Sequence, residues 1–229
     1  MILKKISSVD YVDQLPCPTH PNKKLVLFFA GWGMDERPFS GYARPNQDLI
    51  IAYDYTSLQI DESLLHGYQE IQVLAWSMGV WAASQLLPEL RKRNYPISIC
   101  TAINGTPFPI DDRKGIPIQL FTGTLNTLTD RTLDKFRLRM CGSRKILQHF
   151  LAKAPQRNIE NVRKELSAIE EQVNNLPDTA YQWDQAYIGT EDRIFSTENQ
   201  QRAWAHIPYQ LIDTGHYPEE LFKQLLHKA

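Results

Sequence analysis

Apolar and polar positions divide most of the chain into short hydrophobic runs separated by helical patterns. Most of these runs are nearly continuous rather than alternating, which is typical of strands buried on both faces of a parallel sheet. The run that contains Pro117 fits less well, because proline cannot donate a hydrogen bond to a neighbouring strand. We predict strands at residues 25–30, 49–53, 71–76, 97–103, 116–121, 186–188 and 209–212.

Helical patterns at residues 79–93, 197–206 and 218–228 follow three of these runs. The last begins with Pro218, a residue type favoured at the first helical position. Strands that alternate with helices indicate a doubly wound, mostly parallel sheet. The sequence therefore predicts an α/β fold in a single domain of residues 1–229.

Residues 124–183 interrupt this alternation with a helical pattern that contains no convincing strand, so we predict a helical lid insertion within the domain. Its charges are segregated. Residues 130–164 contain ten basic and three acidic residues, whereas residues 165–192 contain seven acidic residues and no Lys or Arg. Two interpretations remain open: a basic docking surface, or solvated amphipathic helices whose opposite charges pair.

Composition excludes several classes of protein. The chain has 229 residues, 42% of them hydrophobic, and a net charge of -1. This size is sufficient to bury a core without metal or disulfide support, and the charge balance argues against a general nucleic-acid binder. The sequence shows neither an apolar stretch of membrane-spanning length nor the pattern of a signal peptide. We expect a cytoplasmic protein that binds neither nucleic acid nor membrane.

The three cysteines, Cys17, Cys100 and Cys141, lie far apart in the sequence. Their spacing matches neither a disulfide framework nor a zinc site. Free thiols are typical of a reducing compartment. We expect the protein to need no metal and no organic cofactor.

Ser77 carries the strongest chemical signal. It lies between the predicted strand 71–76 and the predicted helix 79–93, with Ala75 two residues before it and Gly79 two residues after it. Small residues at these positions let a strand and a helix cross closely at a strained nucleophile elbow. The Met78 N–H at the start of the helix would then lie near the serine hydroxyl and stabilise an oxyanion. The alternative is a serine that only caps the helix.

Two further groups occupy strand ends in the order that a serine triad requires. Asp192 follows the strand at 186–188, and His216 follows the strand at 209–212. The order Ser, Asp, His is that of α/β-hydrolases. In such a triad the imidazole accepts the serine proton, and the carboxylate holds the imidazole in the correct tautomer. Asp213 is the competing acid, but it lies only three residues before His216, so we predict that Asp192 orients the ring.

Five segments spread over most of the chain carry a family resemblance. They are Phe28-Phe-Ala-Gly-Trp-Gly-Met-Asp35, Ala75-Trp-Ser-Met-Gly-Val-Trp81, Asn104-Gly-Thr-Pro-Phe-Pro-Ile110, Phe136-Arg-Leu-Arg-Met-Cys-Gly142 and Asp213-Thr-Gly-His-Tyr-Pro218. In these segments the chain resembles the α/β-hydrolase superfamily. More closely, it is similar to the BioG-type pimeloyl-[acyl-carrier protein] methyl ester esterases of bacterial biotin synthesis.

The resemblance implies a triad of Ser77, Asp192 and His216, with oxyanion N–H groups from Trp32 and Met78. It further implies hydrolysis of the methyl ester of pimeloyl-[acyl-carrier protein] to pimeloyl-[acyl-carrier protein] and methanol through an acyl-enzyme. The carrier protein is acidic, which gives the basic part of the insertion a role in docking. Two alternatives stay open: a carboxylesterase or thioesterase for free small acyl substrates, and a noncatalytic binding protein with a hydrolase fold.

Overall fold

The computed structural model describes residues 1–6, 24–45, 47–178 and 181–227, so that Cys17 and His20 lie outside the described residues. The strands are β1 (Ile2–Ile6), β2 (Lys24–Phe29), β3 (Asp48–Tyr53), β4 (Glu70–Trp76), β5 (Ile97–Ile103), β6 (Gln185–Gly189) and β7 (Tyr209–Ile212). The helices are α1 (Met78–Lys92), α2 (Ile118–Asn126), α3 (Asp130–Cys141), α4 (Arg144–Ala152), α5 (Ile159–Asn175), α6 (Thr197–Ala203) and α7 (Glu219–His227), with 3₁₀ helices at Arg37–Tyr42 and Glu62–Leu65.

The strands form one sheet in the order β1-β3-β2-β4-β5-β6-β7. All neighbouring pairs are parallel except β1 and β3, which are antiparallel. The predicted mostly parallel sheet is thus confirmed, and six of the seven predicted strands are present with ends within one residue of expectation.

The strand predicted at residues 116–121 is wrong. This run enters α2, with Pro117 directly before the first helical residue. Proline fits there because its missing N–H is not needed at the start of a helix. Ile118 and Leu120 are 54% and 61% exposed, so the run does not cross a core. The sequence also did not predict β1, the antiparallel edge strand.

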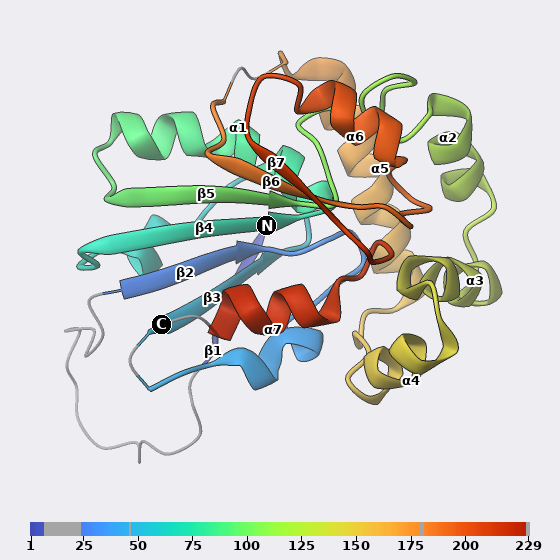
Figure 1. Cartoon of the computed structure of the whole chain (residues 1–229), viewed down its shortest axis with the longest axis horizontal. Helices are drawn as coiled ribbons and strands as arrows, with labels where there is room; N and C mark the ends of the chain where they lie inside the picture. The colour runs from blue at the N-terminus through green and yellow to red at the C-terminus, as the bar shows by residue number, and fades with distance from the viewer. Residues whose placement is uncertain (7–23, 46, 179–180, 228–229) are drawn as a thin grey trace.

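Helices cover both faces of the sheet, which explains why its strands are continuously apolar (Figure 1). On one face, Leu27 and Phe29 of β2 share a buried cluster with Trp81 of α1. On the other face, Phe28 of β2 shares a cluster with Phe222 of α7, and their rings meet edge to face at 5.6 Å. Successive side chains of one strand thus point into two different cores.

Helices α2 to α5 lie between β5 and β6 in the chain and gather beyond one end of the sheet (Figure 1). The first of them begins at Ile118, six residues before the expected start of the insertion, because the run at 116–121 is helical. Helix α5 buries Val162, Leu166 and Ile169 in the same cluster as α1. The role of this segment as a lid stays a prediction. Among the described residues no helix combines the length and apolarity needed to cross a membrane.

Candidate active site

Ser77 occupies the tight connection between β4 and α1 with backbone angles of φ 59° and ψ -129°. A positive φ is strained for a residue with a side chain and is a common feature of functional sites. Gly79 permits the turn, because a Cβ at this position would lie 2.3 Å from the carbonyl oxygen of Phe29. The local sequence therefore forms the sharp strand-to-helix turn that the spacing of small residues predicts.

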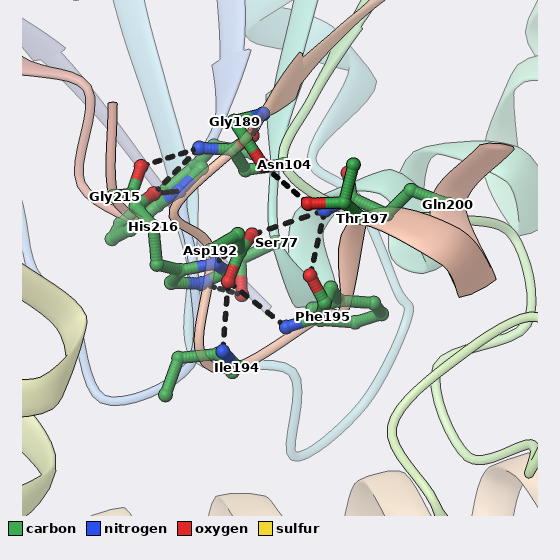
Figure 2. A network of polar contacts seen from close by, with 12 residues as sticks. Ser77, Asn104, Gly189, Asp192, Ile194, Phe195, Thr197, Gln200, Gly215 and His216 are labelled. Carbon is green, nitrogen blue, oxygen red and sulfur yellow. Dashed lines mark hydrogen bonds and ion pairs between the residues drawn. The ribbon is translucent and has the colours of Figure 1, made fainter. Parts of the chain in front are cut away.

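The structure brings the three predicted triad residues together (Figure 2). His216 Nε2 is 2.9 Å from Ser77 Oγ, and His216 Nδ1 is 2.8 Å from Asp192 Oδ2. The side chains of His216 and Asp192 are 1% and 0% exposed. Burial excludes water from the two hydrogen bonds and strengthens the electrostatic coupling between the carboxylate and the imidazole.

The Asp192 carboxylate is hydrogen-bonded on both oxygens (Figure 2). Oδ1 accepts from the backbone N–H groups of Ile194 and Phe195, at 2.8 and 3.0 Å. Oδ2 accepts from Gln200 Nε2 at 3.1 Å in addition to its contact with His216. These hydrogen bonds fix the carboxylate in place, so that its contact with His216 Nδ1 can orient the imidazole.

Asn104, directly after β5, joins the ends of neighbouring segments behind the histidine (Figure 2). Its Nδ2 donates to the carbonyl oxygens of Gly215 and His216, at 2.9 and 3.1 Å. Its Oδ1 accepts from the N–H of Gly189 at the end of β6. One amide therefore fixes the histidine loop to the strand that precedes Asp192.

Asp213, the competing acid, is exposed and lines a separate cavity beside His149 and Glu219. It is Asp192 that contacts the His216 ring. Sequence reasoning missed Gln200 and Asn104. Gln200 lies in α6 without any local signal, whereas Asn104 follows a buried strand, a position that could have marked it as a site residue.

A cavity of about 360 Å³ opens beside Ser77. Trp32, Met78 and His216 line it together with residues of α2 and α3. Among the described residues, neither the Trp32 nor the Met78 backbone N–H donates a hydrogen bond to another protein group. Both residues line the cavity, and the oxyanion role of their N–H groups stays a prediction.

The two cysteines that the structure describes lie in the core of the protein. Cys100 and Cys141 are buried free thiols. Burial raises the pKa of Cys141 to about 12 and raises that of Cys100 as well. A thiol with a raised pKa is a poor nucleophile at neutral pH. Within the described part of the chain, no group of three or more His, Cys, Asp or Glu residues is arranged to hold a metal ion.

Comparison with known proteins identifies the family. A family model described as "Pimeloyl-ACP methyl esterase BioG" matches residues 17–229. The chain belongs to the BioG family. A solved structure of BioG from Haemophilus influenzae is 32% identical, covers 97% of both chains and superimposes with a TM-score of 0.83. An alpha/beta hydrolase from a deep-sea metagenome library has 15% identity and a TM-score of 0.61, covering 98% of this chain and 92% of its own. At that identity the similarity shows the fold alone, and it confirms the predicted α/β-hydrolase fold.

A curated relative from Bacteroides fragilis (strain 638R) is 52% identical over 209 residues. The match covers 90% of this chain but only 42% of the relative, so this chain spans less than half of the relative's length. The relative is named malonyl-[acyl-carrier protein] O-methyltransferase. This name describes transfer of a methyl group, whereas the family description names an esterase.

The specific reaction expected from the sequence is therefore wrong as stated. We expected removal of the methyl ester from pimeloyl-[acyl-carrier protein] in biotin synthesis. The 52% identical relative carries the name of a methyltransferase for a malonyl carrier, which contradicts that assignment in both the acyl group and the direction of the reaction. The chain's family and fold are unaffected by this correction, but the family description and the relative's name do not agree on one reaction.

Proposed function

We propose that this BioG-family chain is a serine-dependent hydrolase that cleaves carboxylic esters. The observation that carries the proposal is the line of hydrogen bonds from Ser77 through His216 to Asp192, at the wall of a cavity. A protein that only binds an acyl group needs no imidazole placed between a hydroxyl and a buried carboxylate. That arrangement activates a serine hydroxyl, which is otherwise a weak nucleophile.

The geometry supports a two-step reaction. His216 Nε2 takes the proton from Ser77 Oγ as the oxygen attacks the carbonyl carbon of the ester, and Asp192 stabilises the imidazolium. The Trp32 and Met78 N–H groups stabilise the oxyanion of the tetrahedral intermediate. The intermediate collapses with cleavage of the bond to the alcohol oxygen, which receives the proton from His216. Water then attacks the acyl-enzyme by the same route and releases the acid and the free serine.

We propose an acyl-carrier protein as the form in which the acyl group arrives. Arg131, Lys135 and Arg139 are exposed on α3 at a spacing that places them on one face of the helix. Lys135 and Arg139 also line the cavity beside Ser77. A positive surface at the entrance of the cavity would guide an acidic carrier toward the serine.

Ion pairs within the insertion leave this face of α3 available. Arg137 pairs with Asp134 in the same helix. Arg157 pairs with Glu165, and among the described residues this is the ion pair that joins the basic segment to the following acidic stretch. The alternative in which the two segments broadly neutralise one another is thus not favoured for α3.

A serine variant tests the proposal. Ser77→Ala should reduce turnover of a p-nitrophenyl ester by at least about 10³-fold, the scale of triad deletions, and should abolish labelling by a fluorophosphonate. Ser98→Ala, at an exposed position on β5, is the matched control and should keep both. Wild-type turnover in folded Ser77→Ala would reject the assignment, and absence of any turnover or labelling in the wild type would favour a noncatalytic binding protein.

A further inference from the structure

Glu165 on α5 is a buried carboxylate that the proposed mechanism does not use. Its residue is 0% exposed. Oε1 accepts a hydrogen bond from the Tyr55 N–H at 3.0 Å, and Oε2 accepts from the Gly33 N–H at 3.1 Å. Arg157 Nη1 lies 2.5 Å from Oε2. Burial raises the pKa of Glu165, and Arg157 and the two N–H donors oppose that rise. A charge at this depth is retained only when it is paired and hydrogen-bonded.

A second hydrogen bond ties the same helix to the preceding residue of the loop after β2. Trp32 Nε1 donates to the carbonyl oxygen of Val162 at 2.8 Å, one turn before Glu165 on α5. Helix α5 therefore holds two consecutive residues, Trp32 by its indole and Gly33 by its backbone N–H. Because the side chain of Trp32 and the peptide that follows it are both anchored, the backbone of Trp32 is fixed relative to α5.

We propose that Glu165 is a positioning residue that holds the Trp32 backbone N–H in place to bind the oxyanion. The inference rests on the proposed ester hydrolysis, in which Trp32 is one of two oxyanion donors. It gives the helical insertion a part in the chemistry, since α5 carries both groups that fix the loop. Preorganised donors of this kind stabilise the transition state more than the bound substrate.

Asp35 supplies a matched control for the loss of a buried carboxylate. It is 7% exposed, and its Oδ2 accepts from the Gln156 N–H at 2.7 Å. Its Oδ1 accepts from the Arg37 N–H at 2.9 Å. Asp35 thus joins the loop after β2 to the chain just before α5, whereas Glu165 joins the same loop to α5 itself. The hydrogen bonds of Asp35 reach neither Trp32 nor Gly33. Asp35→Asn and Glu165→Gln remove the same charge and exchange one acceptor oxygen for an amide.

The experiment separates transition-state binding from substrate binding in the full chain. For Glu165→Gln we expect kcat for a p-nitrophenyl ester to fall by roughly 10- to 100-fold, somewhat less than the loss of an entire oxyanion donor. KM should stay within about twofold, because only the transition state uses the N–H fully. The inhibition constant of an alkyl boronic acid, which forms a tetrahedral adduct on serine, should rise by the same factor as kcat falls. Asp35→Asn should keep wild-type kcat and boronic acid affinity.

Trp32→Phe is the second variant, since it removes the indole donor to Val162 while keeping an aromatic ring and the backbone N–H. It should show the same pattern of reduced kcat, unchanged KM and weaker boronic acid binding, so the test stands even where Glu165→Gln does not fold.

Wild-type kcat and inhibition in either folded variant would overturn the inference. So would equal losses in Glu165→Gln and Asp35→Asn, which indicate a structural role alone. A wild-type chain without turnover or fluorophosphonate labelling would instead reject the proposed function itself.

Discussion

Gly105, directly after Asn104, lies so close to the backbone of Ser77 that no side chain fits between them. A Cβ built at this position would lie 2.4 Å from the carbonyl oxygen of Ser77 and 2.9 Å from its Cα. Ordinary contact begins at 3.4 Å, so Gly105→Ala must displace one of the two backbones by about 1 Å. The hydrogen bond between Ser77 Oγ and His216 Nε2 is 2.9 Å long, and a shift of this size would break it.

We therefore expect Gly105→Ala to lower kcat for a p-nitrophenyl ester by about 10²-fold, the usual consequence of a 1 Å misplacement. It should also destabilise the fold by about 1–3 kcal/mol, as overpacking does. Gly123→Ala in α2 is the control for stability, because its Cβ would meet no atom within 4 Å. That variant should be more stable by about 0.5–1 kcal/mol. Urea unfolding and steady-state kinetics measure both effects. A folded Gly105→Ala variant with wild-type kcat would refute the reasoning, since the backbone would then have relaxed without moving Ser77.

Two further predictions concern the insertion. If α3 docks an acidic carrier, kcat/KM for an acyl-carrier substrate should fall with rising salt and in Arg131→Glu, whereas kcat/KM for a free ester should change little. The control variant Lys92→Glu alters an exposed charge on α1, and an equal response of both substrates would argue against docking. Because burial raises the pKa of Cys141 to about 12, iodoacetamide at pH 8 should leave this thiol unmodified until urea unfolds the chain. The unfolded thiol ionises near pH 9.0 and the folded one near pH 12, so the free energy of unfolding should fall as pH rises between these values. The fall should be smaller in Cys141→Ala, which lacks the thiol. Rapid labelling of Cys141 in the folded chain would contradict its assignment as a buried thiol.

The strands of the sheet could be predicted because strands that are buried on both faces have nearly continuous apolar sequences. The same rule failed at residues 116–121, where Ile118 and Leu120 are exposed at the start of α2 and Leu120 lines the cavity beside Ser77. It also failed for β1, whose two lysines, Lys4 and Lys5, interrupt the apolar pattern at the sheet edge. Hydrophobicity alone predicts burial, and it misleads where apolar side chains line a site or where a strand is only half covered.

The residues of the candidate site also divide into those that the sequence could predict and those that it could not. Ser77, Asp192 and His216 were predictable because each follows a strand, and the carboxyl ends of parallel strands meet at one edge of a sheet. Glu165 and Gln200 lie within helices, and no local pattern distinguishes them from surface residues. Their contacts arise only when distant segments meet; the hydrogen bond from Gly33 to Glu165 joins residues 132 positions apart.

The activity in the family description and the activity in the Bacteroides relative's name differ in the bond that changes. Ester cleavage through Ser77 breaks the bond between the acyl carbon and the alcohol oxygen, whereas methyl transfer forms a bond between the methyl carbon and a carboxylate oxygen and leaves the acyl carbon untouched. A hydroxyl hydrogen-bonded to a buried imidazole attacks an acyl carbon, and N–H groups beside it bind the oxyanion that such an attack creates. Methyl transfer creates no tetrahedral oxyanion and would leave these groups without a role. The arrangement around Ser77 therefore supports the acyl reaction that we propose for this chain, which matches only 42% of the Bacteroides relative's length.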